Sequence, residues 1–145
     1  MFGQAEYIWL DRLGEDYGWT PNFDCKPIKG DWNGSGQHTN ISTRDSCDPA
    51  KGAGAIETYL AQFEKKHKEH IAVYGTGLEE RLTGQHETCS IHQFRAGTAD
   101  RGCSIRIPRQ VATQGYGYFE DRRPGANADP YAIATRILTT LNGSV

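Results

Sequence analysis

Apolar residues recur at helical spacing in three stretches of the chain. The clearest lies over residues 56–71, where every third or fourth position is apolar and the opposite face is charged. A shorter stretch of the same kind covers residues 5–16. The third follows Asp129 and Pro130, residues typical of a helix start, and stops at Gly143. The pattern therefore predicts a helix near each end of the chain and one in its middle.

Alternation of apolar or β-branched residues with polar ones, typical of half-buried strands, marks residues 38–43, 103–108 and 116–122. Side chains alternate between the two faces of a strand, so the polar residues of the first stretch share one face. A face with three polar groups indicates contact with water or a ligand. These groups belong to His38, Asn40 and Ser42.

The remaining pattern sets the expected fold class. A further short strand is expected over residues 23–28, and residues 75–100 read as irregular because glycines interrupt them. Strands and helices do not follow one another in strict alternation, which argues against a doubly wound parallel sheet. We therefore expect an α+β fold in which helices flank an antiparallel sheet.

Composition narrows the function. The 145 residues carry a formal net charge of −2, which makes the chain a poor electrostatic binder of nucleic acid. No stretch approaches the roughly 20 apolar residues of a membrane span, so no membrane partner is expected either. No secretory leader opens the sequence, and we expect a cytoplasmic location. The four cysteines lack C-x-x-C spacing, which favours free thiols over a disulfide framework.

Arginines gather in the half of the chain that carries strands and loops. Their planar guanidinium groups suit carboxylate and phosphate oxygens and stay charged when partly buried. Two interpretations remain open: a pocket for an anionic ligand, or structural ion pairs with Glu120, Asp121 and Asp129. The arginines concerned are Arg81, Arg101, Arg106, Arg122 and Arg123.

His38 follows a glycine-rich loop, Gly30 to Gly36, which lacks the P-loop pattern. Its natural carboxylate partner is Glu120, which shares a polar strand face with Tyr118 and Arg122. An imidazole with oxygen ligands would suit Mg²⁺ or Mn²⁺ better than zinc, provided that further ligands exist. A histidine hydrogen-bonded inside the fold is the alternative. Glu87, in a loop without apolar neighbours, is either ordinary surface or a gate.

Four long motifs together resemble one family. They occur in the order and with the gaps of glutamine synthetases of the eukaryotic type, and the resemblance covers nearly the whole chain from about residue 15. It implies that residues 1–145 are the C-terminal portion of a glutamine synthetase catalytic domain. The motifs are KPIKGDWNGSGQHTNIST (26–43), RLTGQHET (81–88), DRGCSIRIPR (100–109) and GYFEDRRPGANADPY (117–131).

The resemblance also implies a reaction. In this family, glutamate, ammonium and ATP give glutamine through γ-glutamyl phosphate, with Mg²⁺ or Mn²⁺ at the phosphates and with subunits assembled in a homo-oligomeric ring. The motif positions then imply individual roles. Glu87 and Arg101 are catalytic; Asn33, Gly34, Arg81 and Arg122 bind glutamate; Asn40, Ser42, Arg101, Arg106 and Tyr118 bind ATP; His38 and Glu120 bind the metal.

The chain also departs from the family. The N-terminal β-grasp domain is absent, and so is the E-x-E strand that supplies further metal-binding glutamates. The opening residues 1–7 are similar to the family's F-G-x-E-x-E-Y strand but lack its first glutamate, so residues 5–16 are expected as a helix instead. We therefore expect little synthetase activity from this chain alone. The alternative is a non-catalytic short paralogue that associates with full-length subunits. A guanidino kinase is a weaker alternative, because the motifs TGQHET and EDRRP argue against that family.

Overall fold

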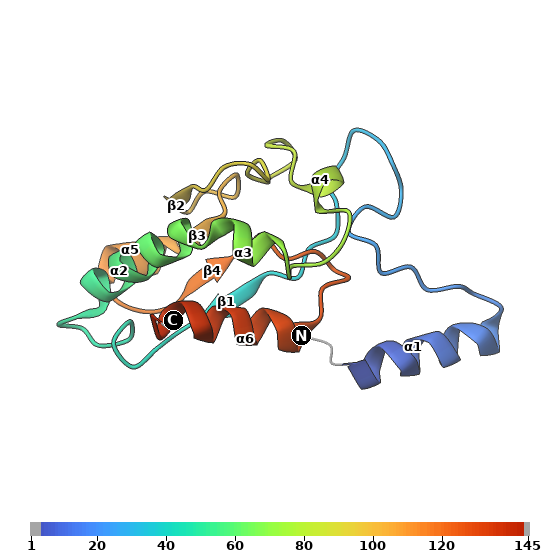
Figure 1. Cartoon of the computed structure of the whole chain (residues 1–145), viewed down its shortest axis with the longest axis horizontal. Helices are drawn as coiled ribbons and strands as arrows, with labels where there is room; N and C mark the ends of the chain where they lie inside the picture. The colour runs from blue at the N-terminus through green and yellow to red at the C-terminus, as the bar shows by residue number, and fades with distance from the viewer. Residues whose placement is uncertain (1–3, 144–145) are drawn as a thin grey trace.

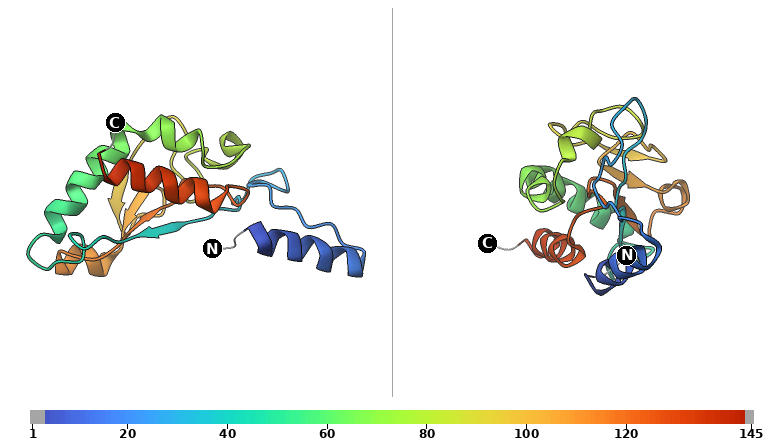
Figure 2. Two further views of the ribbon diagram at one scale, coloured as in Figure 1. Left: turned by 60° about the horizontal axis from the view of Figure 1, so that its bottom comes forward. Right: turned by 90° about the vertical axis from the view of Figure 1, so that its right-hand side faces the viewer.

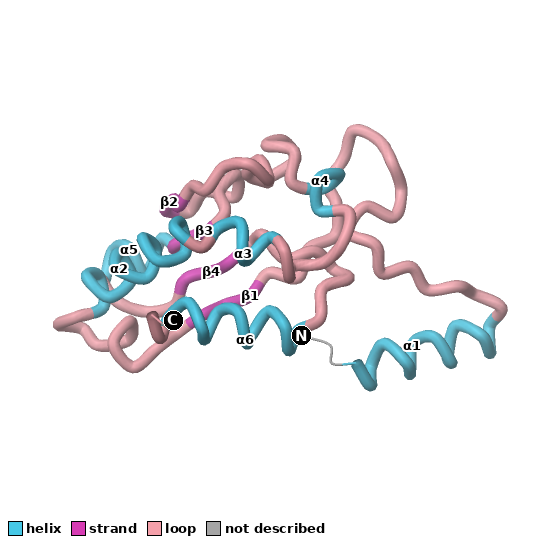
Figure 3. The backbone as a smooth tube through the Cα atoms, viewed as in Figure 1, coloured by secondary structure: helices cyan, strands magenta, loops and turns pink. Residues whose placement is uncertain are grey.

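A sheet flanked by helices forms the body of the protein in a computed structural model, which describes residues 4–143 (Figure 1). The α+β class expected from the sequence is confirmed. Figure 3 shows how much of the chain between these elements is loop, above all the long connection between the first helix and the first strand. The elements are α1 (Gln4–Tyr17), β1 (Thr39–Ile41), α2 (Gly52–Lys65), α3 (His67–Ile71), α4 (Leu78–Arg81), β2 (Ala96–Thr98), β3 (Ile105–Ile107), α5 (Arg109–Gln114), β4 (Phe119–Asp121) and α6 (Pro130–Leu141).

The sheet has four strands in the order β1-β4-β3-β2. Strand β4 is antiparallel to β1 and to β3, whereas β2 is parallel to β3, so the expectation of a wholly antiparallel sheet is wrong. The loop between β2 and β3 returns the chain to the start of β2. Arg95 pins this loop, because its Nη2 donates to Asp100 Oδ2 at 2.9 Å and to the Gly102 carbonyl at 2.6 Å.

Helices α2 and α6 cover one face of the sheet, where the apolar core lies (Figure 2). Ile41, Ile105 and Phe119 point to this face from three strands and are at most 6% exposed. From α2, the ring of Phe63 packs edge-on against Phe119, with 5.8 Å between centroids. From α6, Ile133 completes the core. The residues that alternate with these in the strands therefore point to the opposite face.

The three helices expected from periodicity are present. The long central one is interrupted at Lys66, so that α2 and α3 replace a single helix. At α6, Asp129 caps the helix as expected, because its Oδ1 accepts a hydrogen bond from the Tyr131 N–H at 2.8 Å. The expected helix over residues 5–16 is α1; residues 1–3 of the compared opening lie outside the described residues.

Two expectations about the irregular stretches are wrong. Residues 23–28 form no strand, because Cys25 is held by loops: its carbonyl accepts from the Ser35 N–H at 2.7 Å, and its Sγ lies 3.1 Å from the Gly77 carbonyl oxygen. Residues 75–100 contain α4 and β2 as well as loops. All four cysteines are free thiols. Within residues 4–143, no helix combines the length and apolar character needed to cross a membrane.

A buried polar layer lies between the sheet and the helices; it consists of His67, His70, Tyr74, Asp121 and Arg123. Asp121 Oδ2 accepts from Arg123 Nη2 and from the Tyr74 hydroxyl, each at 2.7 Å. Burial alone would raise the pKa of Asp121, but the charge and hydrogen bonds of Arg123 outweigh it and lower that pKa. The layer therefore holds a paired charge that fixes β4 against the helices.

Candidate active site

The open face of the sheet, opposite the core, carries a row of polar side chains across three strands. Asn40 of β1 and Arg106 of β3 both pair in register with Glu120 of β4. The alternation that sends Ile41 and Phe119 into the core sends these three residues to the open face. The sequence predicted this shared face for Asn40, and the sheet order brings Glu120 and Arg106 beside it.

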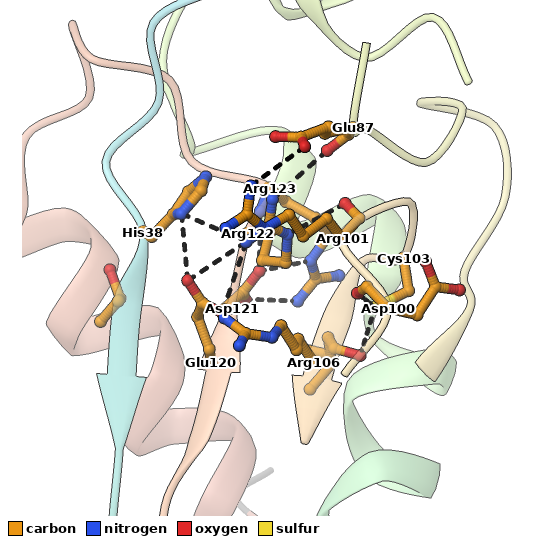
Figure 4. A network of polar contacts seen from close by, with 12 residues as sticks. His38, Glu87, Asp100, Arg101, Cys103, Arg106, Glu120, Asp121, Arg122 and Arg123 are labelled. Carbon is orange, nitrogen blue, oxygen red and sulfur yellow. Dashed lines mark hydrogen bonds and ion pairs between the residues drawn. The ribbon is translucent and has the colours of Figure 1, made fainter. Parts of the chain in front are cut away.

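Glu120 is the centre of the cluster (Figure 4). Its carboxylate accepts from Arg106 Nη1 at 3.0 Å and from Arg122 Nη1 at 3.3 Å. His38 Nδ1 lies 3.0 Å from Glu120 Oε1. The pair proposed from the sequence, His38 and Glu120, is therefore in direct contact, and two arginines surround its carboxylate.

His38 is neutral in this setting. Burial lowers its pKa, the positive charges of Arg122 and Arg81 lower it further, and Glu120 opposes them only in part. A neutral imidazole keeps a lone pair available for a cation or for a proton. The His38 side chain is 37% exposed, so a ligand on the open face can reach it.

Two loops close one end of the cluster. Arg122 directly follows β4 and donates through Nε to the Arg101 carbonyl at 3.1 Å and through Nη2 to the Glu87 carbonyl at 3.4 Å. Arg101 Nη1 in turn donates to Glu87 Oε1 at 3.1 Å. Glu87 thus faces the site and is not ordinary loop surface, although its side chain is 49% exposed. Its φ of +60° is uncommon for a residue other than glycine, a strain often found at functional sites.

Arg81 lies beneath the cluster and is buried. Its guanidinium donates to the carbonyls of Arg122 and Arg123 at 3.0 and 3.1 Å, and its Nη2 lies 3.4 Å from His38 Nε2. Burial lowers the pKa of Arg81 to about 10, so the group stays cationic at neutral pH. Its two hydrogen bonds to backbone carbonyls hold the segment after β4 in place.

The glycine-rich loop passes closely over Arg81. A Cβ at Gly34 would come within 2.5 Å of the Cys25 carbonyl oxygen, and a Cβ at Gly36 would collide with the Arg81 guanidinium. Glycine is therefore required for this close approach. Asn33, next to Gly34, is exposed. Gly34 lies against the Arg81 side chain, and Asn33 stands beside it at the edge of the cluster.

The other end of the open face carries Ser42 and Tyr118. Ile41 pairs with Phe119, so the residues next to them in sequence lie at the same end of the two strands. Tyr118 is 43% exposed and Ser42 is exposed. The structure therefore separates the predicted residues into the charged cluster and an uncharged end, with Asn40 between them.

One contact near the site had no signal in the sequence. His86 Nε2 lies 2.8 Å from Asp31 Oδ1, which ties the loop of Glu87 to the glycine-rich loop. Both residues lie inside the motifs RLTGQHET and KPIKGDWNGSG. Their partnership joins segments far apart in sequence, and spacing alone does not reveal such a pair.

The cluster has a net positive charge that suits anions. Four arginines and two carboxylates, with a neutral His38, leave an excess of two positive charges on or beneath the open face. Arg106 Nε is buried and lacks a hydrogen-bond partner among the described residues. The ion-pair interpretation holds for Arg106 and Arg122, and an anion pocket stays a prediction that the excess charge is compatible with. Arg123 belongs to the buried layer on the other face, and Asp129 caps α6.

A divalent metal fits this cluster only in part. His38 and Glu120 supply an imidazole and a carboxylate side by side, a suitable start for Mg²⁺ or Mn²⁺. Within residues 4–143, however, no group of three or more His, Cys, Asp or Glu side chains is arranged to hold a metal ion. The residues present do not complete a metal site.

Comparisons with known proteins agree on one family, although no family model matches the chain. The chain is 57% identical over 146 residues to the glutamine synthetase of Emericella nidulans, a match covering 97% of this chain and 41% of that protein. It is 56% identical over 132 residues to that of Schizosaccharomyces pombe, covering 91% and 36%. For Yarrowia lipolytica the identity is 50% over 146 residues, covering 97% and 40%. The chain thus spans about two fifths of the length of the curated relatives it matches. With half or more of its residues shared over nearly its whole length, the chain belongs to the glutamine synthetase family.

Proposed function

We propose that this chain is the C-terminal part of the catalytic domain of an enzyme that joins ammonia to glutamate at the expense of ATP. One observation supports this most strongly. A cationic cluster, built from residues of all four family motifs, lies on the open face of the sheet. The substrates of the reaction, ATP and glutamate, are both anions, and an excess of arginine charge matches them.

The open face suits an elongated nucleotide. We propose that Ser42 and Tyr118 contact the uncharged part of ATP, that Asn40 lies alongside, and that Arg106 and Arg101 meet the phosphates. The Arg106 side chain is 32% exposed, so part of it can be reached from the open face. Arg122, Asn33 and Gly34 would then hold glutamate at the charged end, with Arg81 beneath them.

The first chemical step transfers a phosphoryl group. The side-chain carboxylate of glutamate attacks the γ-phosphorus of ATP, the bond to the bridging oxygen breaks, and ADP leaves with that electron pair. The negative charge on the transferring phosphoryl group raises the energy barrier of this step, and fixed cations beside the group lower that barrier. Arg101 is suited to this task, because its Nη1 is held 3.1 Å from Glu87 Oε1 at the mouth of the cluster.

The second step forms the amide. Ammonia attacks the acyl carbon of γ-glutamyl phosphate, phosphate leaves with the electron pair of the broken bond, and the nitrogen loses a proton. Ammonium must give up a proton first, which requires a carboxylate near the reacting carbon. Glu87 is such a carboxylate, carried by a strained loop whose backbone carbonyl meets Arg122.

The metal belongs to the same proposal, with a limit. A divalent cation at His38 and Glu120 would neutralise phosphate charge, but two ligands from this chain do not hold it. The missing ligands must come from polypeptide outside these residues. The incomplete site also supports a second candidate function, a non-catalytic chain that associates with full-length synthetase subunits. A cytoplasmic location stays a prediction for both.

A chimaera tests the proposal directly. This chain would replace its matching segment in the Emericella nidulans enzyme, and glutamine formed from glutamate, ammonium and ATP would be measured. We expect activity, and we expect Arg101→Gln to lower kcat/KM by about 10²–10³-fold, the usual effect of removing one group that stabilises transition-state charge.

Arg136→Gln is the matched control for this experiment, because Arg136 pairs with Glu69 between α6 and α3 and is remote from the open face. Its activity should stay near that of the unchanged chimaera. A folded chimaera that makes no glutamine would overturn the proposal and would favour the non-catalytic candidate. Equal losses for Arg101→Gln and Arg136→Gln would remove the role of Arg101.

A further inference from the structure

Helix α1 and the segment after it carry an unusual number of exposed apolar side chains. In the residues that the structure describes, five of the large hydrophobic side chains that remain exposed fall between residues 8 and 19. Trp9, Tyr17 and Trp19 are 62%, 64% and 71% exposed. Figures 1 and 2 show α1 standing apart from the sheet and from the other helices. Large exposed apolar patches normally mark a surface that another polypeptide covers.

The exposed residues form an organised face. Trp9, Leu13 and Tyr17 are spaced four residues apart and line one side of α1. Asp11 and Glu15 lie on the opposite side of the helix, whereas Arg12 and Asp16 flank the apolar side next to Trp9. The helix is therefore amphipathic in part: Trp9 and Tyr17 of its apolar side are 62% and 64% exposed, while the following segment lies against Leu10 and Leu13.

A hollow beside this face is also apolar. It has a volume of about 400 Å³ and lies between α1 and the following segment, where Leu10, Leu13, Pro21 and Phe23 line it. The rings of Tyr17 and Trp19 stack at its rim, with 5.3 Å between centroids. Face and hollow together form one surface, which we call the α1 surface: Trp9, Leu10, Leu13, Tyr17, Trp19, Pro21 and Phe23.

The relatives indicate what covers the α1 surface. The match to the Emericella nidulans protein covers 97% of this chain, and the unmatched residues are too few to exclude a helix of 14 residues. The match therefore includes at least part of the α1 sequence, within a relative of which this chain spans only 41%. Those proteins hold a large amount of additional polypeptide that can bury an apolar helix face.

We propose that the α1 surface is an interface for the part of a glutamine synthetase that lies outside these 145 residues. Burial of the indole and phenol rings of Trp9, Tyr17 and Trp19 drives this contact. The surface is formed by the N-terminal part of the chain and is separate from the charged cluster. The inference rests on membership of the family and not on the proposed reaction.

Hydroxyl-radical footprinting of the chimaera tests the inference. The oxidation rates of Trp9 and Trp19 would be compared between the 145-residue chain alone and the same chain inside the Emericella nidulans enzyme. We expect both rates to fall several-fold in the chimaera. Tyr131 of α6, which is 67% exposed, reports whether the change is specific to the α1 surface, and its rate should change less.

Substitutions give an independent readout. Trp9→Ser combined with Tyr17→Ser should leave the thermal unfolding of the isolated chain almost unchanged, because both side chains are exposed there. In the chimaera the same pair should lower the unfolding temperature, and Tyr131→Ser should lower it less. A loss seen equally in both settings would assign these residues to the fold of the chain itself and would overturn the inference.

Each remaining outcome is decisive as well. Unchanged oxidation of Trp9 and Trp19 in a folded chimaera would overturn the inference. Protection that grows with the concentration of the isolated chain, with no further gain in the chimaera, would show that a second copy covers the surface and would also overturn it. A chimaera that protects Trp9 and Trp19 but makes no glutamine would leave this inference standing and would overturn only the proposed function.

Discussion

The four consecutive charged residues Glu120 to Arg123 serve two different environments. Side chains alternate across β4 and its continuation, so Glu120 and Arg122 face the open side and Asp121 and Arg123 face the core. Each acid is therefore paired with the arginine two positions later, at 3.3 Å for Glu120 and 2.7 Å for Asp121. The outer pair belongs to the charged cluster on the open face, and the inner pair fixes the strand that carries it.

The inner pair leads to a prediction about stability. Asp121→Asn leaves the guanidinium of Arg123, 2% exposed, without its counter-charge in the core. Removing one partner of a buried ion pair typically costs about 3–5 kcal/mol, and we expect a loss of this size. Urea unfolding of the chain, followed by circular dichroism, measures it.

An exposed ion pair is the control for that experiment. Glu69→Gln breaks the pair between Glu69 and Arg136, and its carboxylate side is 45% exposed. Water screens exposed ion pairs, so this variant should unfold near the unchanged chain. Similar losses for Asp121→Asn and Glu69→Gln would contradict the importance given to burial.

His70 predicts a dependence of stability on pH. Burial and the nearby charge of Arg123 lower its pKa from 6.5 to about 3, and it is held neutral between Tyr74 and Thr140. The unfolded chain therefore takes up a proton below pH 6.5 that the folded chain refuses. This contribution to stability is complete above about pH 6.5 and is lost as the pH falls toward 3.

The size of this effect follows from linkage. Between pH 7 and pH 5, His70 alone should lower the free energy of unfolding by about 2 kcal/mol. Urea unfolding at the two pH values measures the change, and the same measurement on His70→Gln supplies the control, because all other titrating groups remain. The variant should show a smaller dependence; an identical dependence would mean that His70 titrates normally in the folded chain.

At the scale of elements, the sequence predicted the helices and strands that have a periodic pattern of apolar residues. Apolar spacing indicated α2 and α6, and alternation indicated β1, β3 and β4. The parallel strand β2 consists of Ala-Gly-Thr with no apolar alternation, and its partner is chosen by a loop that Arg95 holds. Long-range pairing of this kind leaves no local pattern in the sequence.

The candidate site could also be predicted only in part from the sequence. Motifs pointed to His38 and Glu120, and the sheet register brings them together as expected. Arg81 is different, because burial turns its guanidinium toward backbone carbonyls. The contact between Asp31 and His86 depends on two loops meeting in space. The roles of all these residues in binding stay predictions.

Helix α6 allows the contribution of an N-terminal capping residue to stability to be measured. Asp129 accepts the Tyr131 N–H at 2.8 Å, and Pro130 follows it in the first turn. Asp129→Ala removes this cap and should destabilise the chain by about 1 kcal/mol in urea unfolding. Asp129→Asn keeps a capping oxygen, so its loss of stability should be much smaller than that of Asp129→Ala. Equal losses would show that the carboxylate charge, not the cap, is what stabilises the helix.

At the scale of the whole molecule, the site and the α1 surface show the same incompleteness. The charged cluster has two neighbouring candidate metal ligands, His38 and Glu120, where a divalent ion beside a triphosphate needs more. On the α1 surface, the rings of Trp9, Tyr17 and Trp19 are 62%, 64% and 71% exposed. The two proposals above assign the further ligands and the cover to the same source, polypeptide outside the part of the Emericella nidulans protein, 41%, that this chain matches.

This incompleteness predicts how activity depends on the rest of the enzyme. The 145-residue chain alone should form no glutamine above background, whereas the chimaera should form it. The cation of Arg101 is 64% exposed and Glu87 is 49% exposed, so water screens the charges that must act on the phosphoryl group. Added polypeptide would exclude this water and supply the missing ligands. A coupled assay for ADP and glutamine, run on both proteins with far-ultraviolet circular dichroism as the check of folding, decides the matter. Turnover by the folded isolated chain at a rate near that of the chimaera would mean that His38, Glu120 and four arginines are sufficient, and the requirement for outside ligands would be wrong.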